Sequence, residues 1–113
     1  MRLVVIESPY AGDLGRHSRY LRAAMRDCLL RGEAPFASHA LYTQPGVLRD
    51  IVPSERELGI KAGLFWRRSA AATVVYTDLG VSAGMELGIA AGKALRKAMV
   101  GHALEYRKLE GWS

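Results

Sequence analysis

Two short segments hold the residues of this sequence that could do chemistry, and each follows an apolar run. The first segment reads Glu-Ser-Pro-Tyr-Ala-Gly over residues 7–12, and the second covers residues 78–88. The runs before them, residues 3–6 and 71–76, are typical of buried parallel strands. Because ligands gather beyond the carboxyl ends of such strands, we expect the two segments to form one site.

The second segment has the composition of a phosphate-binding turn. Ser82, Ala83 and Gly84 stand where a helix should begin, and the unpaired amides and dipole of a helix N-terminus favour an anion. Gly84 would let a ligand approach the backbone closely. We therefore predict a phosphate site formed by Ser82, Gly84 and their neighbours Gly80 and Met85, with Ser8 and Gly12 contributed by the first segment. An ordinary Ser82 cap with glycines for tight packing explains the pattern equally well.

Two carboxylates and a phenol belong to the same predicted edge. Asp78 ends an apolar run, Glu86 lies one turn inside the expected helix, and Tyr10 follows the first strand. Paired carboxylates beside a phosphate suggest chemistry at a sugar, where one attacks the anomeric carbon and the other manages the proton of the leaving base. The simpler interpretations are the usual preference for acids in a first helical turn and, for Tyr10, an aromatic that covers the core.

These elements together resemble a known family. Tyr10-Ala11-Gly12, Asp78 and the stretch from Gly84 to Ala90 (Gly-Met-Glu-Leu-Gly-Ile-Ala) are similar to the nucleoside 2-deoxyribosyltransferases and the related 2'-deoxynucleoside 5'-monophosphate N-glycosidases, including small phage or prophage members. The resemblance covers the first strand and the third strand with its helix, and the middle only in topology. Gly80 stands where the family usually has an acidic residue or a serine.

The resemblance implies a role for each catalytic candidate. Glu86 would be the nucleophile, Tyr10 would orient it, and Asp78 would assist the leaving base. Ser82 and Gly84 would bind the 5'-phosphate. It also implies a homodimer or higher homo-oligomer, since sites of this family borrow residues across subunits.

Composition limits the class of protein. The chain has 113 residues, half of them hydrophobic and 24% charged, which fits one globular domain over residues 1–113. We expect no membrane segment, because no stretch of about 18 apolar residues occurs. The single cysteine, Cys28, allows no internal disulfide and suits a cytoplasmic location.

The net charge of +5 suits an anionic ligand such as a nucleotide. The expected small-molecule partner is a nucleotide or a nucleoside. Nucleic acid is not expected, because the basic residues are spread along the chain, mostly on faces that we expect to be solvated. Arg49 and Arg56 could clamp a phosphate or could simply be solvated. We expect no cofactor and no metal, since no His, Asp or Glu spacing resembles a metal site. His39 is interpreted as structural, and His17 and His102 as surface residues.

The order of the elements predicts an α/β fold. We expect a compact Rossmann-like three-layer sandwich with a mostly parallel sheet of four to five strands and helices on both faces. Beyond the two buried strands, the predicted helices cover about 18–30, 54–68 and 83–99, and the weaker strands cover 34–42 and 103–109, the last at a sheet edge. Residues 47–53 are predicted to be an irregular loop.

Some boundaries and faces are predicted from single residues. Ser54 and Glu57 form a capping-box pattern at the second helix. Helical spacing predicts these buried faces: Leu21, Ala24, Met25 and Cys28 in the first helix; Leu58, Ala62 and Phe65 in the second; Leu87, Ala91, Ala94, Leu95 and Ala98 in the third. Phe65 and Trp66 beside Leu64 could instead form a subunit interface, and Trp112 could pack across a subunit boundary.

Three functional hypotheses follow. The first is an enzyme that cleaves or exchanges the N-glycosidic bond of a nucleotide through Glu86, with hydrolysis favoured over transfer. The second is a non-catalytic module that binds or senses a nucleotide through the same helix N-terminus. The third is an interaction protein that retains only the fold, since fold does not fix function.

Overall fold

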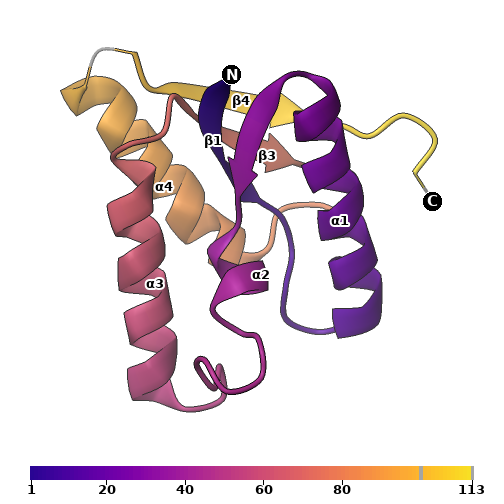
Figure 1. The fold of residues 1–113 in the computed structure, drawn as a ribbon, viewed down its shortest axis with the longest axis vertical. Coiled ribbons are helices and arrows are strands. Elements are labelled where there is room, and N and C mark those ends of the chain that lie inside the picture. The colour runs from indigo at the N-terminus through magenta and orange to yellow at the C-terminus, as the bar shows by residue number, and fades with distance from the viewer. Residues whose placement is uncertain (100, 113) are drawn as a thin grey trace.

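The computed structural model describes residues 1–99 and 101–112 and is built on one parallel sheet (Figure 1). The strands are β1 (Arg2–Glu7), β2 (Glu33–Phe36), β3 (Ala72–Tyr76) and β4 (Ala103–Arg107), in the order β2-β1-β3-β4. All three neighbouring pairs are parallel, and Val5 lies opposite both Phe36 and Thr73. The predicted α/β class is therefore confirmed, with four strands.

The helices cover both faces of this sheet. They are α1 (Leu14–Leu30), the short α2 (Ser38–Leu41), α3 (Pro53–Arg67) and α4 (Ala83–Ala98). Helix α1 lies on one side, while α3 and α4 lie side by side on the other, with α2 next to α3 (Figure 1). This is the expected three-layer, Rossmann-like arrangement.

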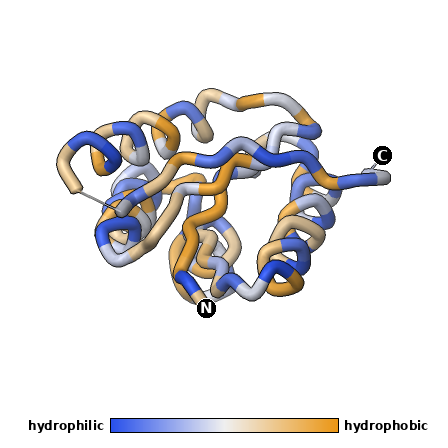
Figure 2. Tube along the Cα trace, turned by 90° about the horizontal axis from the view of Figure 1, so that it is seen from above, coloured by the Kyte–Doolittle hydropathy of each residue, from blue (hydrophilic) through white to orange (hydrophobic). Residues whose placement is uncertain are grey.

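The core lies between the two central strands and α1. Its buried members are Val4, Ile6, Tyr20, Leu21, Ala24, Cys28, Ala37, Ala72, Val74 and Tyr76. A smaller cluster of Val75, Met85 and Ile89 joins β3 to α4. Hydrophobic residues gather in the interior while hydrophilic residues occupy outer turns of the helices (Figure 2). The apolar runs at residues 3–6 and 71–76 and the α1 face with Cys28 are thus predicted correctly.

Helix α4 contacts the sheet through a face that the sequence analysis predicted wrongly. The buried residues are Met85, Gly88, Ile89 and Gly92, whereas Leu87 is 62% exposed. A Cβ atom on Gly88 would overlap the carboxyl group of Glu7, and one on Gly92 would crowd the side chain of Thr73. The two glycines therefore let the helix backbone approach β1 and β3, and this close approach decides which face is buried.

Helix α3 also differs from the prediction at its start and on its buried face. It begins at Pro53, a favoured first helical position, with Val52 as N-cap and no side-chain cap. The predicted capping box of Ser54 and Glu57 is therefore wrong. Its fully buried residues are Gly63 and Arg67; Leu58 and Phe65, predicted to be buried, are exposed.

The second strand is shorter than predicted. It ends at Phe36, the last residue paired with β1, and residues 38–41 form α2 instead of continuing the strand. A close contact between Ser38 and Gly63 packs α2 against α3. Helix α2 therefore lies on the α3 side of the sheet. In this position His39 contacts Ser8, which directly follows β1.

The remaining boundaries shift little. Helix α1 begins at Leu14, four residues earlier than predicted, because Asp13 caps it by accepting from the Arg16 amide at 3.1 Å. Strand β4 lies at the sheet edge as expected and ends at Arg107. Among residues 1–99 and 101–112, no helix combines the length and apolarity needed to cross a membrane.

Candidate functional site

A cavity of about 520 Å³ opens at the carboxyl end of β1, between α2, α3 and the start of α4. The end of β1 contributes Glu7, Ser8 and Tyr10, and α2 contributes Ser38 and His39. Helix α3 contributes residues from Glu55 to Arg67, and α4 contributes Ser82 to Met85, Leu87, Gly88 and Ala91. The cavity therefore lies where ligands bind in parallel α/β sheets.

The N-terminus of α4 forms one wall. The Met85 amide donates to Ser82 Oγ at 3.2 Å, and the Glu86 amide donates to the Ser82 carbonyl at 3.1 Å. The amides of Ala83 and Gly84 belong to the first turn, where a helix supplies no acceptor, and both residues line the cavity. Of the predicted phosphate-binding residues, Ser82, Gly84, Met85 and Ser8 line the cavity.

Tyr10, Ser8 and His39 form a second wall. Ser8 Oγ lies 3.1 Å from His39 Nε2, and the rings of Tyr10 and His39 meet edge to face with centroids 5.8 Å apart. Burial lowers the pKa of His39 to about 4, so the ring is neutral at pH 7. Nε2 of a neutral His39 can accept a hydrogen bond from the Ser8 hydroxyl group. His17 Nδ1 lies 3.0 Å from the Tyr10 carbonyl oxygen, which fixes the turn after β1.

Glu7 and Arg67 lie together at the inner end of the cavity. Arg67 Nη2 donates to Glu7 Oε2 at 2.5 Å, and the two side chains are 5% and 14% exposed respectively. Burial raises the pKa of the Glu7 carboxyl, and the Arg67 charge opposes that rise. The ion pair therefore offsets part of the cost of burying this carboxyl group.

A buried hydrogen-bond chain holds Arg67 from behind. Arg67 Nη1 donates to Thr73 Oγ1 at 2.8 Å, and Thr73 Oγ1 lies 2.9 Å from His102 Nε2. His102 Nδ1 lies 2.9 Å from the Ala70 carbonyl, which can only accept. His102 therefore carries its proton on Nδ1, and Thr73 donates to Nε2. The prediction of His102 as a surface residue is wrong, because it is buried.

Glu86 lies outside this cavity. It is exposed on α4, on the side away from the buried Met85 and Gly88, and it does not line the cavity. Helical geometry explains the placement, because Glu86 is rotated by about 200° from Gly88 around the axis. The structure thus does not bring Glu86 and Tyr10 together.

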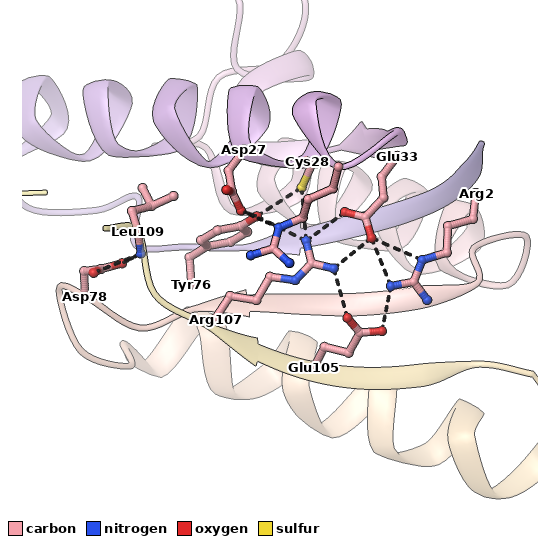
Figure 3. Close-up of polar contacts among 10 residues, drawn as sticks. Arg2, Asp27, Cys28, Glu33, Tyr76, Asp78, Glu105, Arg107 and Leu109 are labelled. Atoms are coloured by element: carbon pink, nitrogen blue, oxygen red, sulfur yellow. Dashed lines mark hydrogen bonds and ion pairs between the residues drawn. The ribbon is translucent and has the colours of Figure 1, made fainter. Parts of the chain in front are cut away.

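Asp78 is also placed elsewhere. Its carboxylate accepts from the Tyr20 hydroxyl at 2.6 Å. It also accepts from the Leu109 amide at 2.9 Å (Figure 3). Burial alone would raise the pKa of Asp78, but these hydrogen bonds hold it below its ordinary value. Asp78 ties α1 and the segment after β4 to the end of β3, and it does not line the cavity.

The two remaining predicted binding residues are turn glycines. Gly12 and Gly80 have φ angles of +95° and +83°, which L side chains rarely adopt. Neither lines the cavity. The turns after β1 and β3 need glycine at these positions because of their backbone conformation, which explains both residues without a ligand.

A separate ion network lies on the α1 side of the sheet. Arg107 donates to both carboxylate oxygens of Glu33, at 2.7 and 2.8 Å, and Arg2 and Glu105 extend the network (Figure 3). The Tyr76 hydroxyl donates to Asp27 at 2.7 Å and accepts from Arg107 at 3.2 Å. This network ties α1 to the strands and does not contribute to the cavity.

The loop before α3 forms the outer rim. Arg49 pairs with Glu55 at 2.8 Å and Arg56 with Asp50 at 3.9 Å, and all but Arg49 line the cavity. Arg49 is 74% exposed and Arg56 57% exposed along their side chains. Of the two predicted phosphate clamps, only Arg56 borders the cavity. Within residues 1–99 and 101–112, no three His, Cys, Asp or Glu side chains gather as a metal site requires.

Residues 2–101 match the family model described as a domain of unknown function, DUF7768. The chain belongs to the DUF7768 family. No curated protein and no solved structure matches it. The matched region of this DUF7768 domain includes all the cavity residues named above, so the site lies within the family's shared unit.

Neither Glu7 nor Arg67 of this DUF7768 domain is predicted as a site residue from the sequence. A signal for Glu7 was present, because it ends an apolar strand at the predicted edge just as Asp78 does. Gly84, Gly88 and Gly92 recur every four residues, which marks the helix face that approaches another element closely. Arg67 gave no such signal, since a helix arginine is ordinarily solvated.

Proposed function

We propose that the cavity binds a nucleotide-sized ligand whose phosphate lies at the N-terminus of α4. One observation carries the proposal: a single cavity joins the first amides of α4 to Tyr10, neutral His39 and the buried cation Arg67. Arg67 is 4% exposed, and within the described chain its Nε has no hydrogen-bond partner. Helix N-termini are established anion sites, and the tyrosine and histidine rings offer a surface for a sugar or base.

The binding proposal is tested by calorimetric titration with nucleoside 5'-monophosphates, nucleosides and inorganic phosphate. Gly84→Asp is the informative variant, because space is open at Gly84 and an acid suits a first helical turn. The added charge should weaken nucleotide binding about tenfold or more without loss of stability. Gly15→Asp, at the same position of α1, is the matched control, since Gly15 does not line the cavity. Equal binding by wild type and Gly84→Asp would contradict the proposal.

N-glycosidic cleavage of a (deoxy)nucleoside 5'-monophosphate is the second candidate. One observation favours it: a carboxylate, Glu7, lines the same cavity as Tyr10. In this version Glu7 takes the nucleophilic role expected of Glu86: its carboxylate attacks the anomeric carbon, the bond from that carbon to the base breaks, and the base leaves with a proton taken from water. A second water molecule then hydrolyses the glycosyl ester and frees Glu7. The ion pair with Arg67 lowers the nucleophilicity of Glu7, so binding without cleavage is the better supported proposal. Chromatographic detection of free base separates the two.

The proposal includes a second copy of the chain. Helices α3 and α4 carry several exposed apolar residues: Leu58, Ile60, Leu64, Phe65, Trp66 and Leu87. Leu64 and Leu87 also line the cavity, so a copy seated there would close it. Sedimentation of wild type and Phe65→Ser tests this: a dimer that Phe65→Ser weakens supports it, and a wild-type monomer at high concentration contradicts it. A cytoplasmic location is likewise proposed, supported by the unpaired Cys28.

A further inference from the structure

The carboxyl group of Glu7 is fixed from two sides. On one side, Arg67 Nη2 donates to Oε2 at 2.5 Å. On the other, the carboxyl group lies so close to α4 that a Cβ atom on Gly88 would overlap it. A side chain held in this way presents its remaining acceptor in a defined direction.

The partner of Glu7 is itself held rigidly. Arg67 Nη1 donates to Thr73, and Thr73 is connected through His102 to the Ala70 carbonyl. Thr73 is wholly buried and His102 is 6% exposed. These bonds hold Arg67 beside Glu7 Oε2.

The second carboxylate oxygen, Oε1, receives no hydrogen bond from residues 1–99 or 101–112. Glu7 lines the cavity, and its side chain is 14% exposed. A carboxylate oxygen accepts hydrogen bonds, so Oε1 offers an acceptor to a ligand that supplies an O–H or N–H donor. A ligand that fills the cavity and displaces water from Glu7 must replace the lost hydrogen bond with a donor of its own.

The spacing along α4 defines where that donor must be. Gly84, at the proposed phosphate position, and Gly88, beneath the Glu7 carboxyl, are separated by four residues, or roughly 6 Å of helix. A phosphorylated sugar covers this span, with its phosphate at one end and its ring hydroxyls at the other. A free phosphate would leave Glu7 without its donor.

We infer that Glu7 selects ligands that carry a ring hydroxyl, so that the ligand is a hydroxylated sugar phosphate such as a ribonucleoside 5'-monophosphate. The inference rests on the proposed function, and it adds the sugar as the recognised part. Glu7 acts here by accepting a hydrogen bond from the ligand. Gly88 is the residue that makes room for it.

The test compares ribonucleoside 5'-monophosphates with their 2',3'-dideoxy forms by calorimetry. In the wild type, the dideoxy forms should bind at least about tenfold more weakly, because they leave Glu7 unpaired. The ratio should fall in Glu7→Gln, because a neutral amide oxygen is a weaker acceptor than a carboxylate, and in Gly88→Ala, because the new methyl group displaces the carboxyl group. Glu57→Gln, an exposed glutamate outside the cavity, and Gly15→Ala are the matched controls and should keep the wild-type ratio. The ratio measured for the wild type does not depend on the stability of any variant. Thermal unfolding shows whether each variant is folded.

The outcomes separate this inference from the proposed function. If both nucleotide forms bind the wild type equally and Gly84→Asp weakens both, the binding proposal stands and the role of Glu7 is wrong. A wild-type preference that survives in both Glu7→Gln and Gly88→Ala also overturns it. If neither form binds, both proposals fail. Release of free base that stops in Glu7→Gln would make Glu7 a nucleophile and overturn the recognition role.

Discussion

The carboxyl group of Glu7 lies directly against the backbone of Gly88, with no room for a side chain between them. This contact joins the end of β1 to the second turn of α4 and defines one end of the cavity. Together with the pair between Glu7 and Arg67, it places a carboxylate and a cation at the same sheet edge as the first amides of α4. The predictions below follow from these contacts and from those that hold the sheet.

Glu33 should make the stability of the fold depend on acidity. Hydrogen bonds from Arg107 lower the pKa of Glu33 to about 2, against an ordinary value of 4.5. Because the folded state binds this proton less readily, the stabilisation is fully present above pH 4.5 and is lost as the pH falls towards 2. Glu33→Gln should lower the free energy of unfolding at pH 7 by about 3 kcal/mol. Denaturant unfolding at several pH values measures this, with Glu57→Gln as the control that should change neither quantity.

His39 should produce a second loss of stability as the pH falls, in a window that begins at higher pH than that of Glu33. Burial lowers its pKa to about 4 from an ordinary 6.5. The neutral ring is favoured by folding, so its contribution is complete above pH 6.5 and declines as the pH falls to 4. His39→Gln should remove the decline in this window and leave the one caused by Glu33. An unchanged decline in the variant would mean that another group titrates there.

Gly92→Ala should destabilise the fold by about 1–3 kcal/mol. The new Cβ would crowd Thr73, which also accepts from Arg67, so the helix or the threonine must move. Gly15→Ala is the matched control, since its Cβ would meet only ordinary contacts. Thermal unfolding of both variants decides the matter, and equal melting temperatures would show that α4 does not need to approach β3 so closely.

Replacement of Asp78 should lower the stability of the fold clearly, whereas replacement of Glu86 should have little effect. Asp78→Ala removes the acceptor of the Tyr20 hydroxyl and the Leu109 amide and should cost about 2 kcal/mol. Glu86→Ala should change stability by less than about 1 kcal/mol and leave ligand affinity unchanged, because Glu86 is exposed outside the cavity. Denaturant unfolding and calorimetry measure both effects. Loss of binding in Glu86→Ala alone would return this residue to the site.

The sequence predicted the framework well where burial is continuous. The runs at residues 3–6 and 71–76 are typical of buried strands and form the central strands β1 and β3. The N-terminal turn of α4, with Ser82 as cap, is also predicted correctly. These features depend on local sequence, which periodicity and turn residues report directly.

The faces of the helices and most of the site could not be predicted in the same way. Helical spacing favoured Leu87 on the buried face of α4, but close approach to the sheet requires Gly88 and Gly92, which have no hydrophobic signal. Arg67 is buried because Glu7 and Thr73, far away in sequence, provide its partners. Tertiary pairing of this kind overrides the preference of a helix arginine for solvent.

The central claim is that one ligand reaches from the first amides of α4 to the end of β1. Nuclear magnetic resonance titration of the labelled protein with a ribonucleoside 5'-monophosphate tests it most directly. The account predicts saturable shifts of the backbone amides of Ala83, Gly84 and Tyr10, while the amide of Leu109, held by Asp78, stays unchanged. Absence of saturable shifts at Ala83 and Gly84, or shifts centred on Leu109, would contradict it.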